Sequence, residues 1–218
     1  MNNKKVRIIS YFYGAKNQTE MKTKLIMMFA ATALLAGCAE RKAATQTAES
    51  QEWKAVTAKE IIDNPIVKVG DEWMALAAGR EGDMNAMTIG WGTWGVLWGR
   101  PVVTVYVSSS RHTHSFMERN EYFTVTGFPE QYRQALSYIG SHSGRDGDKL
   151  KDAGLTPEFT ELGNPIFREA NLAIECRLLY KEVLDVEQVP DRIREMYDRG
   201  VGPHSMYIGE IVNVWVKE

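Results

Sequence analysis

A regular alternation of apolar side chains marks one strand of this chain. Val103, Val105 and Val107 occupy every second position of the run from residue 102 to residue 107, which is the period of a strand with one buried face. Pro101 stands at the start of the run, where its missing N–H costs least. Three serines and Arg111 follow the run. The pattern therefore predicts a strand that ends in hydroxyl groups and a cation.

Shorter patterns predict further elements. The other predicted strands cover residues 66–69, 73–78, 85–88, 122–126, 172–183 and 205–216. Four helices are predicted: one capped by Thr57, one capped by Thr113, one running from Pro129 to Gly140 with period 3.6, and one over residues 190–199. Many strands, few helices and no repeated βαβ order favour a mainly β fold, a closed or half-closed antiparallel barrel with peripheral helices.

The N-terminal pattern is that of an export signal. After Met21, a short basic start is followed by an apolar run from Leu25 to Leu35, too short for a membrane-spanning helix of about 20 residues. Leu35 to Cys38 resembles the lipobox of bacterial lipoproteins. That resemblance implies translation from Met21, cleavage before Cys38 and lipidation of its sulfur. A buried helix or an uncleaved anchor is the alternative.

This interpretation divides the chain into three parts. Residues 1–37 are an N-terminal extension and signal peptide, residues 38–52 are a small and polar tether, and residues 53–218 are one folded domain. The lipid would hold the domain on a membrane of the cell envelope, facing the periplasm or at the outer membrane.

Composition excludes several classes of protein. The chain has 218 residues, 44% of them hydrophobic, which suffices for one full core. A formal net charge of −2 and the lack of a basic run give no reason to expect nucleic acid. Cys176 is the second of two cysteines, so lipidation of Cys38 would preclude an internal disulfide. The four histidines show no HExxH spacing, and we expect no metal site. No carboxylate pair suggests a catalytic acid and base.

Two segments carry candidate anion-binding groups. The first follows the alternating strand and contributes Ser108, Ser110, Arg111 and Thr113. Hydroxyls, a guanidinium and the free N–H groups of a helix start suit a phosphate, although an ordinary capped turn with a solvated arginine has the same sequence. The second segment contributes Ser141, Ser143, Arg145 and Lys149. Here the alternative is a solvated helix start in which neighbouring aspartates form weak ion pairs.

Two short segments partly match known motifs but lack the residues or elements that those motifs require. Gly90, Gly92 and Gly95 fit G-x-G-x-x-G, but no helix long enough for a dinucleotide-binding fold follows. His142 stands where a nucleophile elbow needs serine. We interpret the glycines as places where the backbone passes close to an aromatic ligand or a neighbouring subunit. The nearby tryptophans would add flat apolar surface, or would simply belong to the core.

Taken together, these motifs resemble one family. They are Asn85-Ala86-Met87-Thr88 with Trp91, Pro101-Val102, Ser110-Arg111-His112-Thr113, Ser143-Gly144-Arg145-Asp146 with Lys149, and Gly154-Leu155-Thr156. In this order and spacing the chain from about Trp53 to Glu218 resembles the flavin reductase-like, or flavoredoxin-like, proteins with the FMN-binding split-barrel fold. The resemblance implies a Greek-key split barrel, usually a homodimer, with FMN near the subunit interface.

The resemblance also implies a role for each matched position. Asn85, Ala86, Met87 and Thr88 would border the isoalloxazine ring, largely through backbone groups. Ser108, Ser110, Arg111 and Thr113 would hold the ribityl chain and phosphate, and Ser141, Ser143, Arg145 and Lys149 would complete the phosphate side. His112 departs from the family, where many members have tyrosine, and this puts ring stacking or the local flavin potential in question.

Two functions are compatible with this resemblance. The chain would be a flavin-dependent oxidoreductase that passes electrons from a nicotinamide nucleotide through FMN. Alternatively it would be a non-enzymatic FMN-bearing electron carrier that docks on redox partner proteins. Nicotinamide nucleotides are cytoplasmic, whereas the Cys38 signal directs the domain across the inner membrane, which favours an envelope redox role with another donor. A third possibility is a split barrel that has lost its cofactor and serves a structural role.

Overall fold

The computed structural model describes residues 52–198 and 202–217. The predicted extension, signal peptide, lipidated Cys38 and most of the tether therefore lie outside the described residues. None of the helices described is long and apolar enough to cross a membrane.

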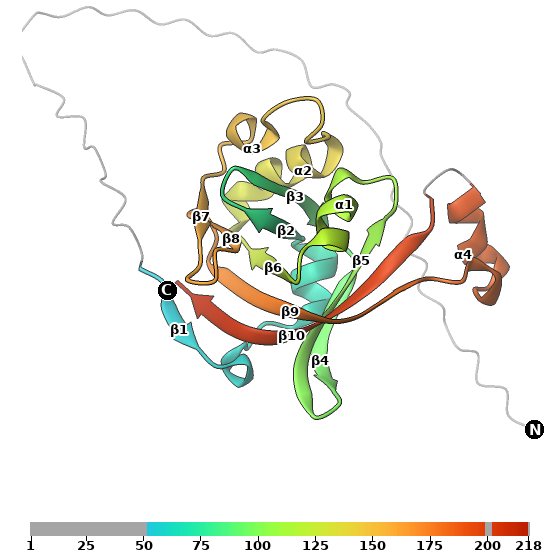
Figure 1. Ribbon diagram of the computed structural model, residues 1–218, viewed down its shortest axis with the longest axis horizontal. Helices are drawn as coiled ribbons and strands as arrows, with labels where there is room; N and C mark the ends of the chain where they lie inside the picture. The colour runs from blue at the N-terminus through green and yellow to red at the C-terminus, as the bar shows by residue number, and fades with distance from the viewer. Residues whose placement is uncertain (1–51, 199–201, 218) are drawn as a thin grey trace, which may run out of the picture. The chain divides into compact units, whose positions relative to one another are not determined.

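Strands dominate the described domain (Figure 1). They are β1 (Lys54–Val56), β2 (Met74–Arg80), β3 (Asp83–Ile89), β4 (Gly92–Leu97), β5 (Arg100–Ser108), β6 (Tyr122–Gly127), β7 (Pro157–Phe159), β8 (Pro165–Phe167), β9 (Leu172–Val183) and β10 (His204–Val216). The α-helices are α1 (His112–Arg119), α2 (Arg133–Ser141), α3 (Lys149–Asp152) and α4 (Asp191–Met196). Three short 3₁₀ helices, η1 (Ala58–Glu60), η3 (Glu130–Tyr132) and η4 (Val186–Gln188), and a π-helix, η2 (Ile66–Asp71), complete the set.

The main sheet is antiparallel and almost closes on itself. Its strand order is β3-β2-β6-β9-β10-β5-β4, with β1 paired to β10. Because β3 ends at Ile89 and β4 begins at Gly92, the chain passes directly from one edge strand of this order to the other. The two edges therefore meet at that end without being hydrogen-bonded neighbours in the described sheet. This confirms the expected half-closed, split antiparallel barrel.

Strand β2 shows why both faces of the sheet are covered. Met74, Leu76 and Ala78 belong to the core inside the barrel, whereas Ala75 and Ala77 belong to a second core that includes residues of α2. All five side chains are fully buried, so the strand has no polar face and its sequence is a continuous apolar run.

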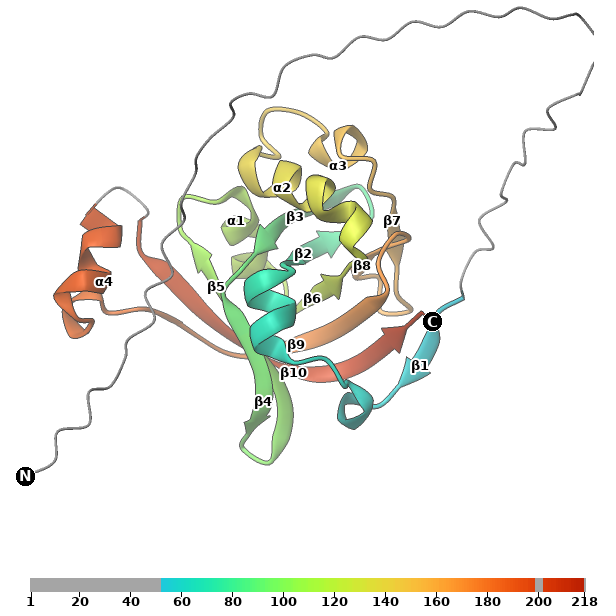
Figure 2. The same ribbon diagram turned by 180° about the vertical axis from the view of Figure 1, so that it is seen from behind.

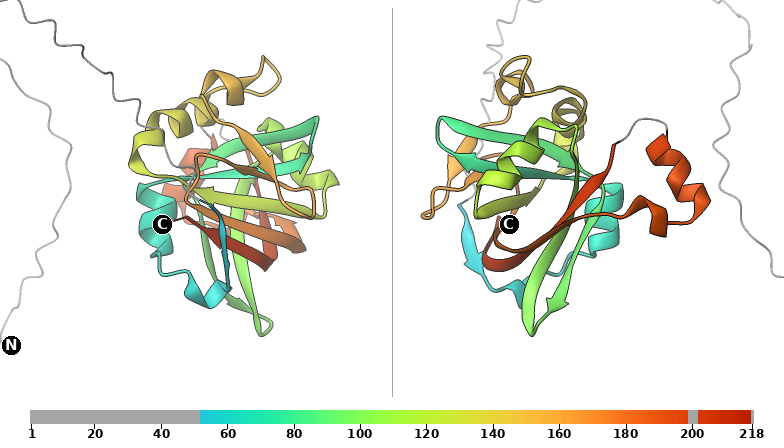
Figure 3. Two further views of the ribbon diagram at one scale, coloured as in Figure 1. Left: turned by 90° about the vertical axis from the view of Figure 1, so that its left-hand side faces the viewer. Right: turned by 45° about the vertical axis from the view of Figure 1, so that its right-hand side comes forward.

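In the views of Figures 2 and 3, η2 lies against the barrel on the side away from α1.

The expected alternation in β5 is confirmed, since Val103, Val105 and Val107 are buried in the barrel core. Residues 66–69, predicted as a strand, instead begin the π-helix η2. Pro65 fixes a helical φ, and the Asn64 side chain accepts the backbone N–H of Ile66 at 3.0 Å, so the segment starts as a helix. The expected helix after Thr57 is a single 3₁₀ turn, η1.

Two helix boundaries and several strands also differ from the sequence prediction. Helix α1 begins one residue before Thr113, which therefore lies inside its first turn and does not cap it. Helix α2 ends at Ser141, one residue beyond Gly140. Strands β1, β4, β7 and β8 were not predicted. In β4, Gly92 and Gly95 interrupt both faces of the strand, so no regular apolar alternation is visible in its sequence.

Candidate functional site

A polar cavity of about 150 Å³ lies where β5 leads into α1 and where α2 leads into α3. Eight predicted site residues line it: Met87, Ser110, Arg111, Thr113, Ser141, Ser143, Arg145 and Lys149. The structure thus brings the two predicted anion-binding segments to one cavity, although Arg111 and Arg145 are distant in sequence. We call this cavity the anion pocket.

Close packing of α2 on β3 brings the two segments together. A Cβ added at Gly140 would lie 3.0 Å from the Thr88 Cβ, so the lack of a side chain at Gly140 allows this close approach. The Thr88 hydroxyl also donates a hydrogen bond to the Leu136 carbonyl of α2. These contacts carry the C-terminal end of α2, and the loop that follows it, to the edge of the anion pocket.

Two of the cations are fixed by the C-terminal end of α2. Arg111 donates from its guanidinium to the Gly140 carbonyl at 2.5 Å. Lys149 Nζ donates to the carbonyls of Ile139 and His142 at 3.0 and 3.1 Å. Cations favour the unpaired carbonyls at a helix C-terminus. Burial, and then the positive charge of Arg111, lower the pKa of Lys149 to about 8.

The hydroxyl groups of the site are not equally available. Ser110 Oγ lies 2.9 Å from Ser108 Oγ, and Ser143 Oγ accepts the backbone N–H of Arg145 at 3.2 Å. Both arrangements leave hydroxyl hydrogen-bonding capacity at the pocket. Ser141 Oγ instead donates back into α2, to the Ser137 carbonyl at 2.9 Å. Ser141 would have to rotate in order to donate to a ligand.

His112, for which the sequence predicts no binding role, also lines the anion pocket. Its Nδ1 atom is buried and has no hydrogen-bond partner. Burial, followed by the charges of Arg145, Lys149 and Arg119, lowers the pKa of the ring. The signals in the sequence were its position between Arg111 and Thr113 and its departure from the tyrosine of many family members.

A second cavity, of about 380 Å³, adjoins the anion pocket and shares Met87, Ser110 and Arg111 with it. It is lined by residues 87–91 at the junction of the two edge strands, and by Tyr106, Ser108 and His204. Trp91 is 43% exposed, and its ring lies 4.8 Å from the ring of His204. We call this the ring-side cavity because its flat aromatic wall suits a planar ligand.

Asn85 and Ala86 line neither of these cavities. Asn85 is 5% exposed and its Nδ2 donates to Thr113 Oγ1 at 2.7 Å. Ala86 is fully buried in the core that includes residues of α2. Their side chains therefore support the pocket wall from behind.

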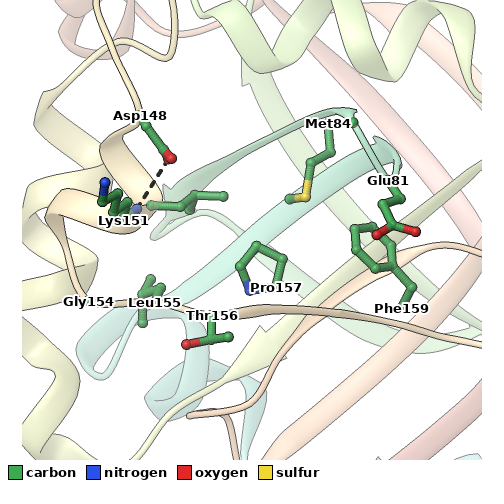
Figure 4. Close-up of a pocket in the computed structure, with 11 residues that line it drawn as sticks. Glu81, Met84, Asp148, Lys151, Gly154, Leu155, Thr156, Pro157 and Phe159 are labelled. Carbon is green, nitrogen blue, oxygen red and sulfur yellow. Dashed lines mark hydrogen bonds between the residues drawn. The ribbon is translucent and has the colours of Figure 1, made fainter.

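A larger cavity, about 680 Å³, lies elsewhere (Figure 4). Its wall includes the apolar side chains of Met84, Leu155 and Phe159. Its one cationic side chain, Lys151, is accompanied by the carboxylates of Glu81 and Asp148. That balance of charge does not suit a phosphate dianion, whereas three cations and several hydroxyls in the anion pocket do. We therefore place the candidate site at the anion pocket and ring-side cavity, despite their smaller volumes.

Other kinds of site find no support. The described residues contain no group of three histidine, cysteine, aspartate or glutamate side chains that could hold a metal ion. Cys176 is fully buried, and its burial raises the pKa of the thiol well above the usual value. It behaves as a small core side chain.

Comparisons with known proteins bear on the family and the fold of the chain. The sequence model for the flavin reductase like domain matches residues 72–218. The fold is similar to an FMN-binding domain of flavin reductases-like enzyme from Shewanella baltica OS155, with 18% identity, coverage of 77% of this chain and 78% of that chain, and a TM-score of 0.56.

Two other similar structures are 25% identical to this chain, each with a TM-score of 0.52. One is flavoredoxin from Methanosarcina acetivorans, for which 67% of this chain and 69% of that chain are covered. The other is an FMN-binding protein from Thermus thermophilus with bound p-hydroxybenzaldehyde, for which the coverages are 66% and 70%. The comparison with curated proteins found no match.

Proposed function

The chain belongs to the family of flavin reductase-like domains, and from that membership we propose that it binds FMN and acts as a flavin-dependent oxidoreductase. The observation that carries the proposal is the meeting of Arg111, Arg145 and Lys149 at one cavity that adjoins an aromatic-walled one. A flavin mononucleotide has an anionic phosphate, which suits the anion pocket, and a planar ring, which suits the ring-side cavity.

The residues of the chain would divide the work of binding. Arg111, Arg145 and Lys149 would neutralise the phosphate, with Ser110 and Ser143 as hydroxyl donors. The backbone from Met87 to Gly90, with Trp91 on the outer side, would border the planar ring. When bound, the flavin supplies hydride and single-electron chemistry, while the protein binds it, orients it and tunes its potential. Because no acid–base pair is required of the chain, we assign no catalytic residue.

A spectroscopic experiment tests the proposal. Residues 39–218 with FMN should give a yellow protein, and anaerobic addition of NADH or NADPH should bleach it if the chain is a reductase. A yellow protein inert to both nucleotides would instead identify an electron carrier that depends on partner proteins. A protein that remains colourless with added FMN would contradict flavin binding altogether.

Arginine variants locate the phosphate. Removing Arg145 should weaken FMN binding by about 1.5–3 kcal/mol, the usual contribution of a charge-assisted hydrogen bond. Arg111→Ala should weaken FMN binding more than Arg145→Ala does, because it also removes the hydrogen bond that the Gly140 carbonyl accepts from Arg111. Arg192→Ala, an exposed arginine on α4, is the matched control and should leave the affinity unchanged. Equal affinity in all three variants would show that the phosphate binds elsewhere.

We also propose that the protein is a lipid-anchored envelope protein, from the lipobox-like sequence at Cys38. Metabolic labelling with palmitate should mark the full-length protein, and Cys38→Ala should abolish the label and release the protein from the membrane fraction. Cys176→Ala should keep the label, because that thiol is buried. Labelling that survives Cys38→Ala would exclude this site.

A further inference from the structure

His112 occupies a distinctive place between the two halves of the anion pocket. It is the first residue of α1, and its ring stands edge-on to Phe116 with the ring centres 5.1 Å apart. On the other side the ring faces the loop before α3, since a Cβ at Gly144 would lie 3.3 Å from His112 Cδ2. The ring is therefore held on both sides and cannot turn freely away from the pocket.

One polar atom of this ring is unused. Nδ1 is buried and has no hydrogen-bond partner, while the residue itself lines the pocket. A buried polar atom without a partner costs free energy. A ligand with hydrogen-bond acceptors would remove that cost if Nδ1 carried a proton.

The charges around His112 keep that proton away in the free protein. Arg145 and Lys149 face it from the loop and from α3, and Arg119 faces it from α1. Asp83, at the start of β3, is the one opposing charge, and it is paired with Arg119 at 2.7 Å. Burial and these three cations lower the pKa of the ring, which favours its neutral form. A dianion placed among the cations would reverse this balance.

We propose that His112 is a further ligand of the flavin phosphate, and that it takes up one proton from solvent as the phosphate enters the anion pocket. The proposal rests on the proposed function, since it assumes that FMN is the ligand. Protonation would give Nδ1 a hydrogen to donate to a phosphate oxygen and would add a fourth positive charge. Binding and protonation would then strengthen each other.

The sign of the pH effect follows from this coupling. A group that binds more protons in the complex than in the free protein makes the affinity rise as pH falls. The second pKa of a phosphate monoester is about 6, so above pH 7 the ligand is already a dianion. An increase in affinity from pH 7.8 to pH 7.0 would therefore come from the protein.

Calorimetry with two ligands tests the proposal. FMN and riboflavin, which lacks the phosphate, are titrated into the mature protein at pH 7.0 in two non-phosphate buffers of different ionisation enthalpy. The dependence of the observed heat on the buffer gives the number of protons taken up. We expect the protein to take up a measurable fraction of one proton for each FMN bound, and to take up no proton when riboflavin binds.

Two variants separate the ring's roles. His112→Phe keeps the packing against Phe116 but has no polar atom, and it should bind FMN about ten-fold more weakly, as expected for loss of one charge-assisted bond, without the wild-type proton uptake. His112→Gln can donate a hydrogen bond without titrating, so it should recover part of the affinity but none of the uptake. Circular dichroism and urea unfolding verify that both variants are folded. Any small uptake by Lys149 is common to all three proteins and cancels in the comparison.

The outcomes also distinguish this proposal from the proposed function. FMN binding with no difference in proton uptake between wild type and His112→Phe would overturn the role of His112 and leave flavin binding intact. Equal uptake with riboflavin would overturn it as well, because the phosphate would not be responsible. A wild-type protein that binds neither ligand would overturn the proposed function itself.

Discussion

Asn85 and Thr113 join β3 to α1 through a buried hydrogen bond of 2.7 Å from the Asn85 amide to the Thr113 hydroxyl. The same Asn85 side chain also meets the loop before α3, because a Cβ at Gly144 would lie 2.2 Å from Asn85 Oδ1. One side chain therefore sets the separation of three segments, two of which carry the cations of the anion pocket.

This contact predicts a strong effect of Gly144→Ala. The added methyl cannot fit beside Asn85, whose amide is held by Thr113, so the loop carrying Ser143 and Arg145 must move outward. Displacements of this kind cost about 1–3 kcal/mol, and FMN binding measured by fluorescence quenching should weaken by about ten-fold or more. Gly95→Ala is the matched control, since no atom lies within 4 Å of its added Cβ. Unchanged affinity in Gly144→Ala would mean that the loop is not part of the site.

A second prediction concerns the pH dependence of binding above pH 8. Lys149 has a pKa of about 8 in the free protein, so above that pH it loses its charge. A bound phosphate would raise this pKa, and FMN affinity should therefore fall progressively as pH rises past 8. Lys151→Ala, which removes an exposed lysine of the same helix, should keep the wild-type profile, whereas Lys149→Met should flatten it. A flat wild-type profile from pH 8 to pH 9.5 would contradict a role for Lys149.

The same pKa has a consequence for stability without ligand. The usual pKa of lysine is 10.5, so between about pH 8 and pH 10.5 the unfolded chain binds more protons at this position than the folded one. The contribution of Lys149 to the free energy of unfolding therefore rises with pH in that window. The contribution to stability thus rises with pH, whereas the FMN affinity falls with pH. Because the two trends are opposite, unfolding without ligand and FMN titration over the same pH range distinguish them.

A third prediction concerns a buried carboxylate outside the site. Glu175 of β9 is fully buried and accepts hydrogen bonds from Thr160, Asn164 and Asn213 at 2.5, 2.7 and 2.6 Å. Glu175→Ala leaves the buried Asn164 amide unpaired, and we expect a loss of about 2–3 kcal/mol in the free energy of unfolding. Urea unfolding followed by tryptophan fluorescence measures it. The exposed Glu161→Ala should change the stability by less than about 0.5 kcal/mol, and an equal effect of both would refute the argument.

The sequence could predict each of the two segments of the anion pocket, because each segment is a short run of neighbouring residues. The strand with buried Val103, Val105 and Val107 ends where Ser108 begins the polar segment, and this order is visible in the residues themselves. That Arg111 and Arg145 face one cavity depends instead on the packing of Gly140 against Thr88. No spacing rule contains that contact, and the family resemblance supplied it.

The features that the sequence did not predict correctly can also be traced to particular residues. Residues 66–69 have strand-forming side chains, but the Asn64 side chain and Pro65 start a helix there. The surroundings of His112 could not be predicted from the sequence, because the ring is partly buried and the cations that lower its pKa come from α1 and from the segment after α2. Those neighbours become visible only in three dimensions.

The last prediction concerns self-association, since we propose that the protein is a homodimer. Five large apolar side chains are exposed on β9 and at the end of the β4–β5 hairpin: Val96, Trp98, Leu179, Tyr180 and Val183. Val96 is 78% and Trp98 64% exposed, and the Trp98 ring lies 6.5 Å from that of Tyr180. Exposed apolar groups of this size mark interaction surfaces.

Val96→Glu would place a charge on this exposed apolar surface and should convert a dimer to a monomer, as measured by light scattering after gel filtration. Leu162→Glu changes an exposed apolar residue between β7 and β8 and should leave the mass unchanged. If FMN lies near the subunit interface, Val96→Glu should also weaken FMN binding, although Val96 lines neither cavity of the site. A monomeric wild type, or a dimer that survives Val96→Glu but not Leu162→Glu, would place any interface on another surface.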